Sequence, residues 1–259
     1  MKKLLKYNNK IYTQEDLINI LIKLGIKHGD IICVHTEIFH FQKPLLPKNE
    51  FLNALLECLI YVIGGNGTLI MPTFTYSFCK NKPYDKSNSK CTVGVLNEFF
   101  RKQKNVKRTD DPIFSFAIKG AKENIFLKRK QQSCFDKNSV YNILAQHKGK
   151  IILLGSETTG FTFTHFIEEQ AQVPYRYFKE FEGNIIYENK ECQFQKIKYY
   201  VRKLNENSRI NILKQISILK NNNNFKVQQF ANAKIVCIDS KSYLDTTLKA
   251  LQENLYCLL

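Results

Sequence analysis

Long apolar runs are absent from this chain of 259 residues. Its longest apolar stretches, residues 54–63 and 151–154, fall well short of the roughly 20 residues that a membrane-spanning helix requires. The apolar run near the N-terminus, in MKKLLKYNNK, stops after two leucines, where a signal peptide would continue. We therefore expect neither membrane insertion nor export, and we predict a cytoplasmic protein.

Paired cysteines are also absent. The eight cysteines are scattered, and none forms a CxxC pair or a metal-ligand cluster with the five histidines. Scattered cysteines in apolar surroundings indicate reduced thiols rather than a disulfide framework. The sequence therefore predicts no bound metal.

Acidic residues are few, since 23 Asp and Glu stand against 39 Lys and Arg, which gives a net charge of +16. Such a charge favours anionic partners, namely nucleic acid, a membrane surface or phosphorylated small molecules. The chain is also rich in Lys, Asn and Ile together, as AT-rich genomes encode, and this is an alternative cause of the charge. Because the basic residues form no arm and no RNA-binding aromatic motif is present, a nucleic-acid-binding module is the less favoured reading.

The sequence does contain alternating helix and strand patterns. Residues 31–34 and 68–71 are continuous apolar runs typical of buried strands, and residues 48–63 between them have the pattern of a helix. This βαβ arrangement predicts an α/β fold with a mixed, largely parallel central sheet flanked by helices. Residues 113–118 and 150–154 are further predicted strands.

Residues 174–232 differ in character from the rest of the chain. They carry many charges, and alternation in residues 184–187 and 193–199 indicates antiparallel strands. We expect a smaller α+β lobe here that binds the substrate, within a single domain of residues 1–259.

Polar loops follow three predicted strands at their carboxyl ends, where open α/β sheets bind ligands. In the third loop, GFTFTHFIEE, His165 lies at the start of a predicted helix, which favours the neutral imidazole. Glu168 and Glu169, three and four residues later, favour the imidazolium. His165 is therefore a candidate general base, and the alternative is an ordinary histidine beside two solvated glutamates.

Two other motifs are weaker signals. The run Gly64-Gly65-Asn66-Gly67 resembles a phosphate-binding loop only loosely, since it lacks the Lys-Ser/Thr pair and precedes a strand, so we predict a turn. Asp110 and Asp111 precede Pro112 and are more typical of turn formation than of paired catalytic carboxylates. A kinase or helicase is therefore not expected.

Five segments, taken in order, resemble the aminoglycoside 3-N-acetyltransferase family of acetyl-CoA-dependent enzymes. They are Leu24-Gly25-Ile26 through Val34-His35-Thr36, GTLIMPT at residues 67–73, Arg108-Thr109-Asp110-Asp111-Pro112 with Ser115-Phe116-Ala117, Leu153-Leu154-Gly155 with Thr164-His165-Phe166-Ile167-Glu168, and Phe230-Ala231-Asn232-Ala233. The resemblance covers nearly the whole chain. It implies direct attack of an acceptor amine on the thioester of acetyl-CoA.

The resemblance also implies site residues. His165 would be the general base and Glu168 the carboxylate that orients it. The predicted contacts to acetyl-CoA are His35, Thr36, Glu37, Ile38, Thr73, Phe74, Thr75, Arg108 and Ser115, with the pyrophosphate near the backbone of Thr36. The predicted contacts to the acceptor are Tyr76, Glu157, Phe161, Phe163 and Tyr175.

The chain also departs from the family pattern. Asp111 replaces the usual histidine of its segment, and residues 157–161 replace an asparagine-rich loop. A basic chain disfavours a polycationic acceptor, so the expected acceptor is a nucleotide-linked amino sugar, with an aminoglycoside as the alternative. The sequence leaves open whether the chain forms a homo-oligomer.

Overall fold

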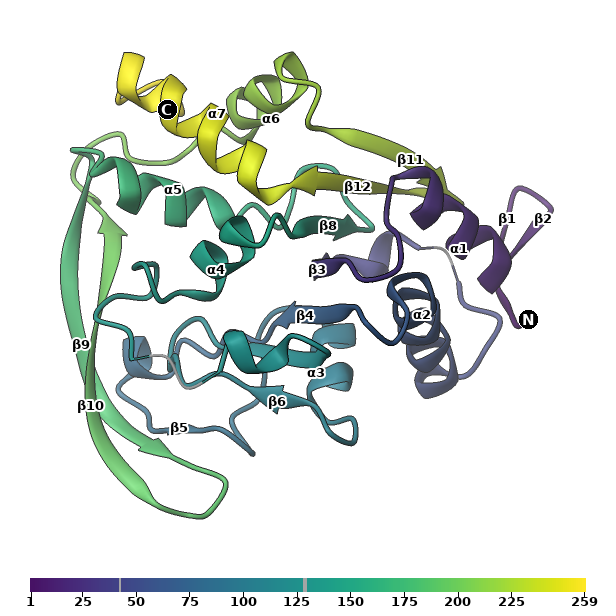
Figure 1. Cartoon of the computed structure of the whole chain (residues 1–259), viewed down its shortest axis with the longest axis horizontal. Helices are drawn as coiled ribbons and strands as arrows, with labels where there is room; N and C mark the ends of the chain where they lie inside the picture. Colours follow the sequence, from purple (N-terminus) through teal and green to yellow (C-terminus); the bar gives the residue numbers. More distant parts are fainter. Residues whose placement is uncertain (42, 128–129) are drawn as a thin grey trace.

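The computed structural model describes residues 1–41, 43–127 and 130–259. Its main sheet has seven strands in the order β11-β12-β8-β3-β4-β7-β6 (Figure 1). Their bounds are β3 Ile31–Thr36, β4 Thr68–Pro72, β6 Lys107–Arg108, β7 Phe116–Gly120, β8 Lys150–Leu154, β11 Lys226–Phe230 and β12 Ala233–Asp239. The expected mixed α/β class is confirmed.

Fewer strand pairs of the main sheet are parallel than predicted. Only β3 with β4 and β3 with β8 run parallel, while β11–β12, β12–β8, β4–β7 and β6–β7 are antiparallel. The prediction of a largely parallel sheet was therefore wrong outside the three central strands. A continuous apolar run shows that a strand is buried on both faces, but it contains no information on the strand's direction.

Helices cover both faces of this sheet. They are α1 Gln14–Lys23, α2 Lys48–Ile63, α3 Val95–Arg101, α4 Val140–Gln146, α5 Phe163–Ala171, α6 Ile212–Asn221 and α7 Ser240–Glu253. Alternate residues of each strand enter opposite cores: Ile31 and Cys33 pack with residues of α4 to α7, and Ile32 and Val34 with residues of α1 to α3. The result is a three-layer α/β/α arrangement.

Short-range hydrogen bonds determine where several of these helices and strands begin. Thr13 caps α1, its hydroxyl accepts the Asp16 N–H, and the Asp16 carboxylate accepts the Thr13 N–H. The predicted strand at residues 113–118 begins only at Phe116, because the Asp111 carboxylate accepts the N–H groups of Ile113 and Phe114, each at 2.8 Å. Asp111 is thus a turn former.

A second sheet has the order β10-β9-β5 and lies beside the main one. Strands β9 (Arg176–Ile186) and β10 (Cys192–Arg202) form a long antiparallel ribbon, which Figure 1 shows bowed along one side of the molecule, and β5 (Tyr84–Asp85) joins its end. The predicted antiparallel strands are present, although longer than expected. A short hairpin, β1 (Lys3–Tyr7) with β2 (Lys10–Thr13), precedes α1.

Three short 3-10 helices complete the described elements: η1 Ile38–His40, η2 Phe78–Lys80 and η3 Glu123–Ile125. None of the helices within the described residues has both the length and the apolar content that a membrane crossing requires.

Candidate active site

A buried ionic cluster holds the candidate base at the start of α5. His165 Nδ1 lies 2.7 Å from Glu168 Oε2, and Arg176 Nη2 lies 2.9 Å from the same oxygen and 3.0 Å from Nδ1. The Glu168 side chain is fully buried, whereas a quarter of the His165 side chain is exposed. The carboxylate therefore fixes one nitrogen of the ring, and no hydrogen bond to Nε2 comes from the described residues, so this nitrogen can accept a proton.

Glu168 stays ionised in spite of its burial. Burial alone would raise the pKa of this carboxyl, but the hydrogen bond with His165 and the charge of Arg176 outweigh it and hold the pKa below its usual value. Arg176 is itself buried, and its Nη1 donates to the Tyr200 carbonyl of β10 at 3.0 Å. The Glu168 carboxylate is thus available to stabilise an imidazolium at His165.

Glu169 differs sharply from its neighbour. Its Oε1 accepts a hydrogen bond from the Ser133 hydroxyl, and its Oε2 has no hydrogen-bond partner among the described residues. Burial raises the pKa of Glu169 to about 7. Of the two glutamates, only Glu168 contacts His165.

Two cavities adjoin at the loop before α5. The first, here called the His35 cavity, has a volume of about 390 Å³, and the second, the His165 cavity, about 670 Å³. Gly160 and Thr162 line both. Two ligands placed in these cavities would therefore meet at this loop, next to His165.

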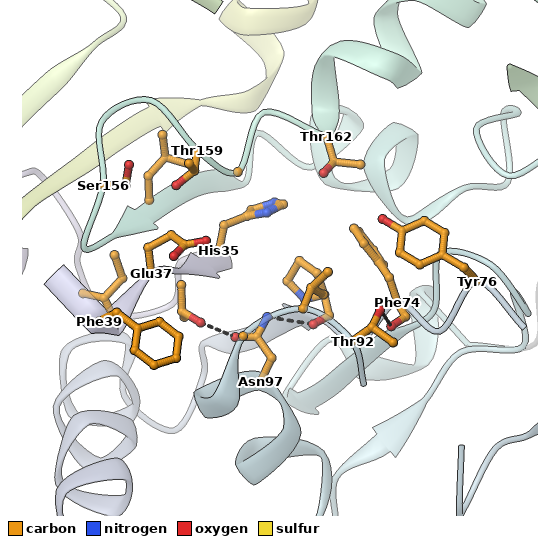
Figure 2. A pocket seen from close by; sticks show the side chains of 17 residues that line it. His35, Glu37, Phe39, Phe74, Tyr76, Thr92, Asn97, Ser156, Thr159 and Thr162 are labelled. Carbon is orange, nitrogen blue, oxygen red and sulfur yellow. Dashed lines mark hydrogen bonds between the residues drawn. The ribbon is translucent and has the colours of Figure 1, made fainter. Parts of the chain in front are cut away.

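The His35 cavity lies at the carboxyl ends of β3, β4 and β8, where the sequence predicted it (Figure 2). Burial lowers the pKa of His35 to about 4, so its ring is neutral, and Nε2 lies 3.2 Å from the Tyr141 hydroxyl. The Thr36 hydroxyl donates to Asn97 Oδ1 at 2.6 Å, and Asn97 Nδ2 donates to the Pro72 carbonyl at 2.7 Å. These two hydrogen bonds fix the orientation of the Asn97 side chain, and Glu37 is the only Asp, Glu, Lys or Arg among the described lining residues.

The predicted cofactor residues divide into two groups. The structure brings His35, Thr36, Glu37 and Phe74 together in the lining of the His35 cavity. Ile38 instead faces a neighbouring hollow, and the Thr75 hydroxyl is buried and donates to the Pro112 carbonyl. The Glu37 N–H donates to the Leu154 carbonyl at 2.9 Å, so the backbone after Thr36 does not offer this donor to a pyrophosphate.

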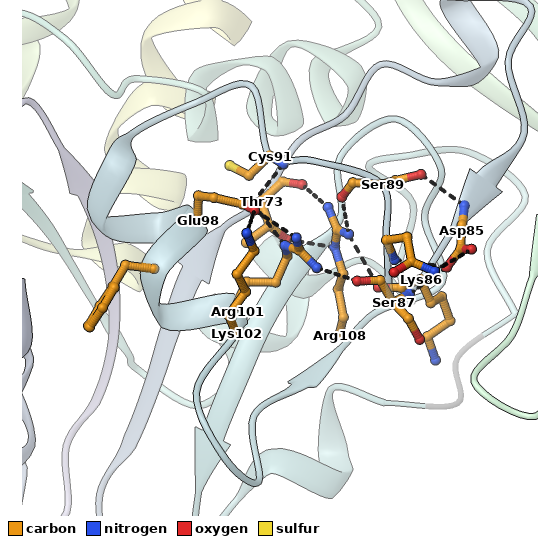
Figure 3. Close-up of polar contacts among 12 residues, drawn as sticks. Thr73, Asp85, Lys86, Ser87, Ser89, Cys91, Glu98, Arg101, Lys102 and Arg108 are labelled. Atoms are coloured by element: carbon orange, nitrogen blue, oxygen red, sulfur yellow. Dashed lines mark hydrogen bonds and ion pairs between the residues drawn. The ribbon is translucent and has the colours of Figure 1, made fainter. Parts of the chain in front are cut away.

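The other predicted contacts form a separate buried cluster (Figure 3). Arg108 donates from Nη2 to the Thr73 carbonyl at 2.6 Å, from Nη1 to the Ser89 carbonyl at 2.7 Å, and from Nε toward the hydroxyls of Thr73 and Ser115, each at 3.2 Å. Arg108 and Ser115 line neither cavity. Since protein groups already occupy these donors, we leave Thr73, Arg108 and Ser115 out of the acetyl-CoA site.

The predicted acceptor residues are also dispersed. Phe161 lines the His165 cavity, whereas Tyr76 lines the His35 cavity. Glu157 forms an ion pair with Lys234 and lines neither. Phe163 and Tyr175 are buried, so the prediction that they contact the acceptor is wrong.

Each of these two aromatic residues has a core environment instead. Phe163 packs against Tyr141, Phe166 and Tyr243, and Tyr175 packs against Tyr256. They lie on the inner side of their segments, a property that the sequence pattern of hydroxyl and aromatic residues did not reveal.

Several site residues were missed by the sequence analysis. Asn97 and Gly94 line the His35 cavity, and Arg176 contacts both His165 and Glu168. Asn97 lies in the middle of α3, and no local pattern marks it. Nowhere in the described part of the chain do three or more His, Cys, Asp or Glu side chains gather in a way that could hold a metal ion.

A histidine held by a buried carboxylate at the junction of two cavities is an arrangement that can support general-base catalysis between two ligands. The chain belongs to the aminoglycoside 3-N-acetyltransferase family, whose model matches residues 34–252. Family membership confirms the predictions of an N-acetyltransferase and of acetyl-CoA as its co-substrate.

Individual relatives share less than a third of their aligned residues with this chain. Aminoglycoside N(3)-acetyltransferase IV of Salmonella sp. is 29% identical over 167 residues, which cover 63% of this chain and 61% of that relative. The SPbeta prophage-derived aminoglycoside N(3')-acetyltransferase-like protein YokD of Bacillus subtilis is 24% identical over 73% of this chain and 76% of its own length.

Solved structures share the fold. A histidine-to-alanine mutant of aminoglycoside acetyltransferase AAC(3)-IVa in complex with a gentamicin superposes with a TM-score of 0.80 at 24% identity, covering 98% of this chain and 93% of its own. The binary complex of AAC-IIIb with CoASH has a TM-score of 0.79 at 19% identity, covering 93% and 97%. No nucleotide-sugar enzyme is among these relatives, so the comparisons favour the alternative acceptor, an aminoglycoside.

Proposed function

We propose that this protein transfers the acetyl group of acetyl-CoA to a primary amine of an aminoglycoside-type acceptor, with His165 as the general base. The observation that carries the proposal is the position of His165, held by Glu168 beside the junction of the two cavities. In this arrangement the thioester reaches the junction from the His35 cavity and the amine from the His165 cavity.

The reaction is a direct displacement. With Nδ1–H donating to Glu168, Nε2 of His165 accepts a proton from the acceptor amine as its nitrogen attacks the thioester carbon. The new C–N bond forms, the C–S bond breaks, and the thiolate of CoA leaves and takes up a proton. The imidazolium that forms meanwhile is stabilised by Glu168.

The lining of the His165 cavity favours a second candidate acceptor. Lys179, Arg202 and Arg209 line this cavity beside Arg176, and none of the described lining residues is Asp or Glu. A polycationic aminoglycoside would meet like charges here, whereas an amino sugar that carries a phosphate or carboxylate would be attracted. The second candidate is therefore an anionic amino sugar, of which a nucleotide-linked one is an example.

Thiol release from acetyl-CoA, measured with gentamicin, apramycin and a uridine-diphosphate-linked amino sugar, tests both acceptors. Turnover with an aminoglycoside supports the first candidate, and turnover only with the nucleotide sugar supports the second. Absence of thiol release with every acceptor overturns the proposal.

Two variants make the test specific. His165→Asn should abolish turnover with whichever acceptor reacts. Arg202→Glu should raise kcat/KM for a cationic acceptor and lower it for an anionic one by about tenfold, roughly the effect of one partly screened charge.

A further inference from the structure

A third cavity, here called the Glu169 cavity, has a volume of about 980 Å³. None of its described lining residues also lines the His35 cavity or the His165 cavity. Ile197 of β10 lines it, and the partner of Ile197 across the ribbon, Phe181 of β9, lines the His165 cavity. The Glu169 cavity is therefore a neighbour of the proposed catalytic centre along the ribbon, but it is a separate space.

The buried part of this cavity contains a carboxylate oxygen that lacks a donor. Glu169 has only 4% of its surface exposed, and while the Ser133 hydroxyl donates to Oε1, no described residue donates to Oε2. A buried acceptor without a hydrogen bond is costly, and such groups are rare in folded proteins. Oε2 is therefore suited to accept a hydrogen bond from a ligand in the cavity.

Three further carboxyl groups line the cavity, those of Asp110, Asp111 and Asp136. Protein groups already contact each of them. Lys86 pairs with Asp110 at 2.8 Å, and the N–H groups of Gln132 and Asn138 donate to Asp136 at 2.6 and 2.8 Å. Glu169 thus differs from the other three in having an oxygen available for a ligand.

The basic residues of the lining lie away from this oxygen. Every lysine of the described lining is exposed: Lys130, Lys137 and Lys196. The carboxyl groups of Glu169 and Asp111 are buried. The inner part of the Glu169 cavity is therefore acidic, whereas the described lining of the His165 cavity contains Lys and Arg but neither Asp nor Glu. A cationic group is attracted to the first cavity and repelled from the second.

Amide side chains make up most of the uncharged polar lining, among them Gln170, Gln193 and Gln195. A carboxamide has two N–H donors and a carbonyl acceptor, so it can pair with a hydroxyl group in either sense. The lining also contains the aromatic ring of Tyr187. These groups favour a ligand whose body carries hydroxyl groups.

We propose that the Glu169 cavity is a second, non-catalytic binding site for a primary amine that carries several hydroxyl groups. The ammonium group donates to Oε2 of Glu169, and the hydroxyl groups pair with the amides of the lining. This inference does not depend on the proposed function, because binding here needs neither acetyl-CoA nor His165.

Calorimetric titration with two probes tests the site in the absence of acetyl-CoA, so that no turnover occurs. The probes are glucamine, a sugar alcohol in which a primary amine replaces one hydroxyl, and sorbitol, which has a hydroxyl in that place. Glucamine should bind at pH 8, and sorbitol should bind about tenfold more weakly or less, because a hydrogen bond between charged groups is lost. Glu169→Gln should weaken glucamine binding by about tenfold or more for the same reason.

Two further variants control for net charge and for location. Glu253→Gln makes the same change in net charge at an exposed residue outside the lining, and it should leave glucamine binding unchanged. Gln195→Lys places a cation at an exposed lining position and should weaken glucamine binding by about twofold to fivefold.

The pH dependence of binding is a second measurement. Burial raises the pKa of Glu169 to about 7, and the ammonium group pairs with the ionised carboxylate, so the affinity of the wild type for glucamine should rise about tenfold between pH 6 and pH 8. Glu169→Gln should lose most of this rise. The other titratable groups that interact with Glu169 are Asp111, Cys134, Asp136 and Tyr200. Burial raises the pKa of Asp111 to about 6, so its ionisation acts in the same direction, and burial also raises the pKa values of Cys134 and Tyr200, which stay neutral.

Weaker glucamine binding by Glu169→Gln, together with an unaffected Glu253→Gln, supports the site. Equal affinities for glucamine and sorbitol, no binding of glucamine at millimolar concentration, or an unchanged affinity of Glu169→Gln overturns it. Binding that is lost in His165→Asn but kept in Glu169→Gln would place the amine in the catalytic centre and also overturns it.

Discussion

Glu168→Gln removes one charge from the buried cluster around the base and almost no volume. The glutamine oxygen can still accept a hydrogen bond from His165 or Arg176, so the ring keeps its place. What is lost is the negative charge opposite the imidazolium, 2.7 Å from His165 Nδ1. The variant therefore separates the electrostatic role of Glu168 from its role in orientation.

The size of the effect follows from the geometry. Opposite unit charges about 4 Å apart attract by about 4 kcal/mol at an effective dielectric constant of about 20. Since about 1.4 kcal/mol corresponds to a tenfold change in rate, we expect kcat to fall by about 10³-fold. The Arg176 guanidinium, 3.0 Å from Nδ1, remains and opposes the imidazolium further. KM for acetyl-CoA should be unchanged, because Glu168 lines neither cavity.

Thiol release under saturating acetyl-CoA measures kcat, and thermal denaturation measures the accompanying loss of stability. A buried cation without its partner costs about 3–5 kcal/mol, so the single variant is destabilised as well. The double variant Glu168→Gln/Arg176→Met carries neither charge and should recover most of this stability while remaining inactive. If either variant keeps kcat within about tenfold of the wild type, the electrostatic reasoning is refuted.

Two further predictions concern residues beside the site. Glu169→Gln should stabilise the protein at pH 8. The raised pKa of about 7 means that the contribution of Glu169 to the free energy of unfolding is fully present near pH 4 and is lost as the pH rises to 7. The free energy of unfolding of the variant should exceed that of the wild type by up to about 3 kcal/mol at pH 8, and the difference should shrink toward pH 4. Chemical denaturation at both pH values measures this difference, and an equal difference at the two pH values would contradict the prediction. Gly155→Ala should lower Tm and raise KM for acetyl-CoA, because Gly155 has φ +108° and an added Cβ would lie 2.4 Å from the Glu37 carbonyl oxygen, at a backbone cost of at least about 1–2 kcal/mol. Gly65→Ala, with nothing within 4 Å of its added Cβ, is the control, and equal effects of both variants would refute the packing argument.

Elements that depend on local sequence were predicted well. The bounds of α2 (Lys48–Ile63) and β8 (Lys150–Leu154) agree with the pattern, because an unbroken helical or apolar run ends at a glycine in each case. The Thr13 cap of α1, seen in the structure, is a local feature of the same kind, since it depends on residues only three positions apart. His165 and Glu168 were found for the same reason, since one turn of a helix brings them together.

Features that depend on distant segments were not predicted. Arg108 was expected at the cofactor, but its partners Thr73 and Ser89 come from other segments and enclose it. Arg176 contacts Glu168 and His165 from the first position of β9, after the end of α5, and no local sequence pattern indicates this contact. The positive charge that the composition indicates is present in the lining of the His165 cavity. The burial of individual aromatic residues, such as Phe163 and Tyr175, was not predicted.

The guanidinium of Arg176 joins two parts of the molecule. One nitrogen holds Glu168 on α5, and another holds the Tyr200 carbonyl in β10, on the ribbon that lines the His165 cavity. We expect that an acceptor too large for the cavity would displace the ribbon and, through Arg176, the Glu168 carboxylate beside His165. If His165 is the base, we therefore expect the size of the acceptor to affect the rate of proton transfer as well as affinity, so that turnover should discriminate between acceptors more strongly than binding.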